Sequence, residues 1–401
     1  MADSDTENRR SSVFVEPIIL LLVGVVLFIA LLNNQTSLTV FCMLVFAMIA
    51  GARGWSRLSL AGIRCRLKAD KKKLFPGEEV LLTARIENNK FLPIWLQVAP
   101  VIDGRLRVDT GDMPFVRDSG LLWHQQVSFD WRLTASRRGV HRVGPLRLAV
   151  GDPMGFCPLE KQTADFHDIV VYPRLVPLNP LLLPRRDFFG IPGARSPIED
   201  PVYIHGTRDY QYRRPARFIH WKASARYNRL QEKVCEPAEQ EKILLLVCTD
   251  RFAEDETGEA FERGLEVAAS LALEFARLRY AVGLATNGHL TGGGRAILPV
   301  TRNRNQLSEI LETMARLEAM PRESLVDMLQ RGLTLPWGVT GVCLVYRHDA
   351  GSRALKEYFK HRNIPLVMIV CGPHDAAAPE AAADRSLYRL ADLRLEERGN
   401  P

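Results

Sequence analysis

The chain has 401 residues, of which 47% are hydrophobic and 25% charged, and its formal net charge is +7. This composition is ordinary for a globular protein with some membrane content, and the length predicts more than one domain. The seven cysteines are dispersed without a C-x-x-C spacing, which excludes a disulfide framework and indicates small buried thiols in a reducing compartment. The modest charge does not favour nucleic-acid binding as the general function.

Two apolar runs lie near the N-terminus. Residues 18–32 and 38–52 are each fifteen residues long, carry no charge and are separated only by the polar turn NNQTS. A bilayer requires about 20 apolar residues, and flanking side chains such as Val13 and Trp55 extend the runs. We therefore predict a cytoplasmic tail at 1–12 and a transmembrane helical hairpin at 13–56.

The basic residues around these runs predict the orientation of the hairpin. Arg9 and Arg10 precede it, and a run at 53–73 with eight basic residues and one acid follows it, so both termini are expected in the cytoplasm. The basic run is also expected to contact anionic membrane lipids. The alternative is a cleaved signal peptide followed by an anchor at 38–52, but acids among the first seven residues and the lack of a small-residue cleavage site argue against it.

Hydrophobic residues alternate with polar ones across residues 57–172. The alternation is clear at 80–86, 127–133 and 146–150, and turn signals such as FPGE and GDP lie between such stretches. This pattern predicts an antiparallel β-sandwich of the immunoglobulin-like kind, and nothing in it has a catalytic spacing. Residues 173–205 are rich in proline and leucine, which indicates an extended connector.

Strands and amphipathic helices alternate across residues 237–401, which predicts an α/β domain with a doubly wound parallel sheet. The expected strands are 243–249, 280–286, 342–346 and 366–371. The expected helices are 258–278, 305–320, 324–331 and 352–361.

A basic and aromatic stretch lies between these two regions, and we call residues 206–236 the Arg/Trp segment. It begins GTRDYQYRRPARFIHWKASAR, and Pro215 suits the first position of a helix at 215–226. Helical spacing places Phe218 and Trp221 on one face, which we expect to be buried. The structural residues of this segment are Tyr210, Pro215, Phe218, Ile219 and Trp221. The candidates for binding a partner or an anion are Arg208, Arg213, Arg214, Arg217, Lys222 and Arg226.

The same stretch resembles a known bacterial family. The run R-D-Y, then P-x-R-x-I-H-W-K-A-S-A-R, Leu230 and Glu236-Pro237, is similar to the signature of the domain-of-unknown-function 58 family, and the resemblance extends to RRGVHRVGPLRLAVGDPMGF upstream. That signature usually reads R-E-Y-x-P-G-D-P-x-R-x-I-x-W, so Arg213 and Arg214 stand where Gly-Asp is usual. The resemblance implies a multi-pass protein of the bacterial inner membrane, a von Willebrand factor A-like domain and a MoxR-type AAA+ ATPase as partner.

The first strand of the α/β region ends at Asp250. In von Willebrand factor A domains a D-x-S-x-S sequence there binds a divalent cation, but this chain reads Asp250-Arg251-Phe252-Ala253-Glu254 and lacks both serines. Asp250 is thus the only candidate metal ligand, and we expect neither a metal nor a cofactor. The glycines at 292–294 lead into a strand rather than a helix, which excludes a phosphate-binding loop.

Together these features favour a membrane-anchored, non-enzymatic adaptor that docks partner proteins during assembly or maturation of protein complexes. One alternative is an enzyme that acts on an anionic substrate at Asp250, although the sequence offers no activated nucleophile. A second alternative is a protein that binds anionic lipid or nucleic acid through its basic stretches; no recognition motif for nucleic acid accompanies them.

Overall fold

The computed structural model describes most of the chain. The described residues are 11–60, 62–103, 106–109, 115–151, 159–179, 199–211, 215–237, 242–332, 335–336, 338–373 and 387–393. Contacts divide the chain into two compact units, and each is described below by itself. The first contains Met1–Lys72, Gly77–Ser136 and His141–Ile169, and the second contains Lys73–Pro76, Arg137–Val140 and Val170–Pro401. Two short segments from within the predicted sandwich region, 73–76 and 137–140, thus belong to the second unit.

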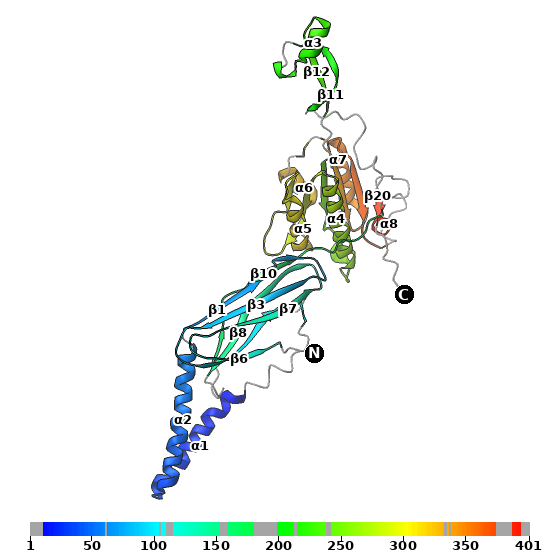
Figure 1. Ribbon diagram of the computed structural model, residues 1–401. Helices are drawn as coiled ribbons and strands as arrows, with labels where there is room; N and C mark the ends of the chain where they lie inside the picture. Colours follow the sequence, from blue (N-terminus) through cyan, green and yellow to red (C-terminus); the bar gives the residue numbers. More distant parts are fainter. Residues whose placement is uncertain are drawn as a thin grey trace, which may run out of the picture. The chain divides into compact units, whose positions relative to one another are not determined.

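The first unit begins with a pair of helices, α1 (Ser11–Leu32) and α2 (Thr36–Leu60), which lie side by side (Figure 1). Among the described residues, no helix combines the length and the apolar character needed to cross a bilayer. Each apolar run has only fifteen residues, and Arg57 lies in the last turn of α2. The predicted transmembrane hairpin, and the multi-pass inner-membrane location built on it, are therefore wrong.

Two β-sheets follow, and the alternating stretches at 80–86, 127–133 and 146–150 lie in three of their strands. One sheet has the order β1, β3, β7, β5, with bounds Ile63–Ala69, Glu79–Asn88, Gln126–Ala135 and Leu106–Asp109. The other has the order β2, β10, β8, β4, β6, with bounds Lys73–Leu74, His167–Val171, Gly139–Gly151, Ile94–Ile102 and Arg117–Leu121, and β9 (Leu159–Gln162) pairs with β8. Alternate side chains are buried along β3, β4, β7 and β8, so each sheet presents one apolar face to a core.

The second unit contains a six-stranded sheet in the order β16, β14, β13, β18, β19, β20. The bounds are Ile297–Thr301, Ala281–Thr286, Lys242–Val247, Val339–Val345, Leu366–Val370 and Leu387–Arg389. All neighbours pair in parallel except β16, which pairs with β14 in the antiparallel direction. A shorter pair, β15 (Gly288–Leu290) and β17 (Leu317–Pro321), lies outside this sheet.

Helices cover both faces of the six-stranded sheet. Ile243, Leu245 and Val247 of β13 pack in one apolar cluster with α4 and α5, whereas Leu244 and Leu246 pack in a second cluster with α6 and α7. Because alternate residues of one strand enter two cores, β13 is apolar throughout. The helices are α4 (Glu259–Arg277), α5 (Gln306–Arg316), α6 (Leu325–Gly332), α7 (Ala350–His361) and α8 (Leu390–Leu393), and the 3₁₀ turn η2 spans Phe252–Glu254.

One predicted helix is shorter than expected. The pattern predicts a helix over 305–320, but α5 ends at Arg316 and the chain continues as β17. Leu317 already has extended backbone angles, and its amide donates to the carbonyl of Met314. Pairing with β15 therefore ends the helix, which the local periodicity does not reveal.

The Arg/Trp segment forms an antiparallel ribbon with a helical turn between its strands. Its elements are β11 (Glu199–Asp209), the 3₁₀ turn η1 (Ala216–Phe218), α3 (Trp221–Tyr227) and β12 (Gln231–Pro237), coloured green in Figure 1.

Candidate functional site

The helix of the Arg/Trp segment is interrupted, contrary to the prediction of one helix over 215–226. The chain leaves η1 with Ile219 extended, and an isolated bridge pairs Ile219 with Glu232 of β12. Helix α3 then begins after His220, whose Nδ1 accepts a hydrogen bond from the amide of Ala223 at 3.1 Å. His220 thus serves as the N-cap residue, a role that sequence patterns assign to Ser, Thr, Asp or Asn.

This interruption changes which side chains are buried. Ile219 and Ser224 are buried, and Phe218 is half-buried, whereas the side of α3 that carries Trp221 is open to solvent. Trp221 is 68% exposed, so the prediction that it packs against the domain is wrong. An exposed side chain usually contributes less than about 0.5 kcal/mol to folding, so Trp221 is not a core residue of this segment.

Buried polar contacts hold α3 on the ribbon. The hydroxyl of Ser224 accepts from the amide of Gln231 at 2.8 Å and donates to the carbonyl of His220 at 3.1 Å. The amide of His220 donates in turn to the carbonyl of Gln231 at 2.8 Å. Because these groups are paired with each other, α3 has a fixed position on β12.

The two acids of the described part of Gly206–Glu232 are engaged within the segment. The side chain of Glu232 is fully buried, pairs with the guanidinium of Arg208 and accepts from the amide of Gln211 at 3.4 Å. Asp209 pairs with Arg229 at 3.0 Å and accepts from the side-chain amide of Gln231. Arg208 is therefore an internal partner of a buried carboxylate, with half of its side chain exposed.

The other predicted binding residues are distributed unevenly. Lys222 and Arg226 are exposed on α3, and exposed Arg217 lies over the ring of Phe218 at 5.1 Å. Tyr210 is half-buried and Pro215 is exposed. Arg213 and Arg214 lie outside the described residues.

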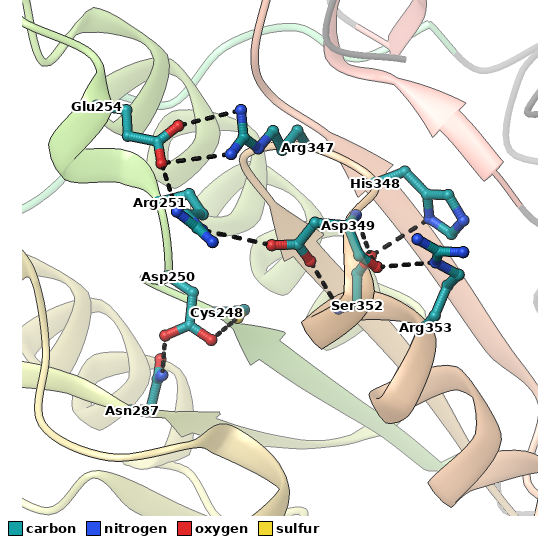
Figure 2. Close-up of polar contacts among 10 residues, drawn as sticks. All are labelled: Cys248, Asp250, Arg251, Glu254, Asn287, Arg347, His348, Asp349, Ser352 and Arg353. Carbon is teal, nitrogen blue, oxygen red and sulfur yellow. Dashed lines mark hydrogen bonds and ion pairs between the residues drawn. The ribbon is translucent and has the colours of Figure 1, made fainter. Parts of the chain in front are cut away.

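A second group of polar side chains lies at the carboxyl ends of the parallel strands (Figure 2). Asn287, which follows β14 and is 2% exposed, donates to Asp250 Oδ1 and to the carbonyl of Glu323, both at 2.9 Å. Its Oδ1 accepts from the amide and the hydroxyl of Thr249 at 2.9 and 3.1 Å. The thiol of Cys248 donates to Asp250 Oδ2 at 3.4 Å. Both carboxylate oxygens of Asp250 are thus used inside the protein.

Charged side chains next to Asp250 form a connected set of ion pairs (Figure 2). Arg251 has a left-handed backbone (φ 65°), and its guanidinium lies 2.9 Å from Glu254 and 3.7 Å from Asp349. Arg347 pairs with the same Glu254 at 3.2 Å. Asp349 also caps α7 by a reciprocal pair of hydrogen bonds with Ser352. Opposite charges therefore meet at these strand ends.

These contacts bear on whether the strand ends can bind a metal ion. In the part of the chain that the structure describes, no group of three or more His, Cys, Asp and Glu side chains is arranged to hold a metal ion. The serine positions of the metal-binding sequence are filled by Phe252, which is buried, and by Glu254, which is held by two arginines. The residues present therefore do not fit a cation site of that type.

Sequence inspection identified Asp250 but missed Asn287 and Asp349. A signal for both exists, because each follows a strand that pairs directly with β13, and the carboxyl ends of neighbouring parallel strands meet at one edge. Using that signal requires the order in which the strands pair in the sheet. Local sequence patterns do not give this order.

Residues 206–332 match the family model described as "Protein of unknown function DUF58". Over this segment the chain belongs to the DUF58 family. The DUF58 segment contains the described Arg/Trp residues and the α/β unit from β13 to α6. No curated protein matches the chain.

Several solved structures resemble parts of this DUF58 protein. They include the complex of zinc α2-glycoprotein and prolactin-inducible protein from human seminal plasma (14% identity, 27% of this chain, 92% of that chain, TM-score 0.22). The cupredoxin domain of amoB from Nitrosocaldus yellowstonii is similar at 10% identity over 28% of this chain and 89% of that chain, with a TM-score of 0.21. Salmonella α2-macroglobulin is similar at 16% identity over 30% of this chain and 8% of that chain, with a TM-score of 0.22. These TM-scores are too low to assign a fold or a function.

The Cys248 thiol of the DUF58 segment should resist alkylation at neutral pH. Burial, together with the nearby charge of Asp250, raises its pKa to about 12. Because only the thiolate reacts with iodoacetamide, modification of Cys248 should stay negligible up to about pH 9 in the folded protein and become rapid in urea. Peptide mapping by mass spectrometry measures both rates. Rapid labelling of Cys248 in the folded protein at pH 7 would show that this strand end is open.

Replacing Asn287 with Ala should destabilise the strand ends of the six-stranded sheet. The substitution removes two hydrogen bonds donated by the side-chain amide and two accepted by it, from a residue that is only 2% exposed. We expect a loss of about 2 kcal/mol in the free energy of unfolding, measured by urea denaturation. His289→Ala is the control, because that half-exposed side chain meets Glu318 at the surface and should change stability by less than about 0.5 kcal/mol. Equal stability of both variants would contradict the role assigned to Asn287.

Proposed function

We propose that this DUF58 protein is a non-enzymatic adaptor that docks a partner protein on its Arg/Trp segment. The observation that carries the proposal is the 68% exposure of Trp221 on a helix that the buried hydrogen bonds of Ser224 hold on the ribbon. Tryptophan, tyrosine and arginine contribute most of the binding energy in many protein interfaces. A rigid helix that presents Trp221 and Arg226 to solvent has the chemistry of such an interface.

A MoxR-type AAA+ ATPase is the first partner to test, since the family resemblance implies this association. Docking on such an ATPase would place the chain in the assembly or maturation of protein complexes. The contacts at the strand ends of the α/β unit favour an adaptor over an enzyme. Both oxygens of Asp250 accept internal hydrogen bonds, and Glu254 is bound by Arg251 and Arg347. A substrate at these strand ends would have to displace these contacts.

Replacing Trp221 with Ala should abolish docking without loss of stability. Exposed side chains usually contribute less than about 0.5 kcal/mol to folding, whereas a central interface tryptophan contributes about 2 kcal/mol or more to binding. We therefore expect an unchanged melting temperature and at least a tenfold weaker affinity for the purified MoxR-type ATPase. Affinity should be measured by biolayer interferometry with the full chain, in ATP and in ADP.

Trp123→Ala is the matched control, because Trp123 is also exposed, to 57%, but belongs to the first unit. It should leave the affinity unchanged. If the ATPase binds wild type and Trp221→Ala equally well, docking takes place elsewhere. If it binds neither wild type nor variant in either nucleotide state, the proposed partner is wrong.

A further inference from the structure

Helix α3 presents a continuous stripe of exposed side chains. At 100° per residue, Trp221 and Ala225 lie next to Lys222 and Arg226, and the buried Ser224 lies opposite the two cations. All four stripe residues are exposed. The stripe therefore combines one large aromatic ring, a small neighbour that leaves the ring accessible, and two cations.

The two cations of the stripe do not stabilise α3 as a pair. Lys222 and Arg226 are four residues apart, a spacing at which like charges destabilise a helix by about 0.2–0.5 kcal/mol. Lys222 also lies in the first turn, where the helix dipole disfavours a cation. The pair therefore has no evident benefit for folding of the segment.

The two acids of Gly206–Glu232 pair with other side chains. Asp209 is engaged by Arg229 and Gln231, and the buried Glu232 is engaged by Arg208. In the part of the chain that the structure describes, neither Lys222 nor Arg226 meets a carboxylate within ion-pair distance. Their charge remains available to a carboxylate from another molecule.

We propose that the α3 stripe binds an acidic segment of a partner protein that carries an aromatic or aliphatic side chain beside its carboxylates. The carboxylates pair with Lys222 and Arg226, and the apolar side chain packs on Trp221 over Ala225. This inference rests on the proposed docking function and names the chemistry of the partner. Nucleic acid would satisfy the same cations through phosphates, but the exposed small residue beside the ring fits an apolar side chain that packs against it.

Fluorescence anisotropy of labelled peptides with the full chain tests the inference. One peptide contains Glu and Asp around a single Phe, a second has Ser in place of Phe, and a third has Lys in place of every acid. The wild-type chain should bind the first peptide, the second at least tenfold more weakly, and the third not at all. The affinity for the first should fall as salt is raised from 50 to 300 mM, because screening weakens exposed ion pairs.

Charge reversal provides the decisive comparison. The double variant Lys222→Glu, Arg226→Glu should lose binding of the acidic peptide at least tenfold and gain binding of the lysine peptide. The variant Arg302→Glu, Arg304→Glu has the same charge change at two exposed positions of the second unit and should bind like wild type. Circular dichroism confirms that each variant is folded. A reversal variant that still binds the acidic peptide like wild type overturns the inference, as does single-stranded RNA that binds more tightly than the acidic peptide.

The two proposals fail in different ways. If Trp221→Ala loses the ATPase while the charge-reversal variant keeps it, docking on the Arg/Trp segment is supported and the acidic partner segment is overturned. If neither variant affects binding of the ATPase but the reversal variant loses the acidic peptide, the acidic recognition is supported and the ATPase is not the partner of this surface.

Discussion

Replacing Arg138 with Ala should destabilise the second unit by roughly 3 kcal/mol. Only 9% of the Arg138 side chain is exposed, and its Nη1 donates to the carbonyls of Met314 and Leu317, both at 2.8 Å. These carbonyls lie where α5 ends and β17 begins, and that of Met314 also accepts from the amide of Leu317. The guanidinium also pairs with Glu262 at 2.7 Å and lies over the ring of Phe261. Urea denaturation of the full chain, followed by tryptophan fluorescence and circular dichroism, measures the loss.

Two further substitutions separate the hydrogen bonds of Arg138 from its charge. Arg138→Lys keeps a cation near Glu262 but cannot reproduce the planar arrangement of donors, so we expect an intermediate loss. Arg142→Ala is the control, because its side chain is 63% exposed and its ion pair with Asp168 is a surface contact worth less than about 1 kcal/mol. If Arg138→Ala unfolds at the same urea concentration as Arg142→Ala, the carbonyls of α5 do not depend on this guanidinium.

Local patterns identify the longer buried strands, because the burial of each residue is visible in the strand's own sequence. Val80, Leu82, Ala84 and Ile86 are all fully buried on one side of β3, as their alternation predicts. The apolar run that forms β13 is buried on both faces, and this explains why it lacks alternation. Such features require no knowledge of distant residues.

Contacts between distant residues explain what the sequence does not predict. Arg138 reaches carbonyls more than 170 positions away along the chain, and no local pattern distinguishes it from the neighbouring Arg137. The predicted burial of Trp221 fails for a similar reason. Helical periodicity over 215–226 assumes a continuous helix, but Ile219 pairs with Glu232 and interrupts it. The side chains after the interruption therefore face directions that the periodicity does not give.

The apolar runs at the N-terminus correctly predict helices but not whether those helices span a membrane. They do form helices, as their lack of charge and of turn residues indicates, but neither helix is long and apolar enough among the described residues to cross a bilayer. Fifteen uncharged residues extend about 22 Å as a helix, against a hydrocarbon thickness of about 30 Å.

Arg208→Ala is expected to open the Arg/Trp segment, with a local loss of roughly 3–5 kcal/mol. The substitution removes the guanidinium that pairs with the fully buried carboxylate of Glu232, and a buried charge is costly when its ionic partner is lost. Glu232 also contacts the amide of Gln211, so the loop that follows β11 should open together with the ribbon. Hydrogen exchange of the β11 and β12 amides reports this opening, because protection should fall there while the six-stranded sheet stays protected.

The reciprocal substitution should be less damaging, and the difference tests the explanation. Glu232→Gln leaves behind Arg208, whose half-exposed side chain can regain water, whereas Arg208→Ala removes a cation from a carboxylate that is fully buried. We therefore expect the double variant to be more stable than Arg208→Ala alone, which a double-mutant cycle quantifies. Arg229→Ala serves as the control, because Arg229 and Asp209 are both more than 60% exposed and their pair should contribute less than about 1 kcal/mol. If Arg208→Ala and Arg229→Ala reduced protection equally, the burial of Glu232 would not be what makes Arg208 essential to this segment.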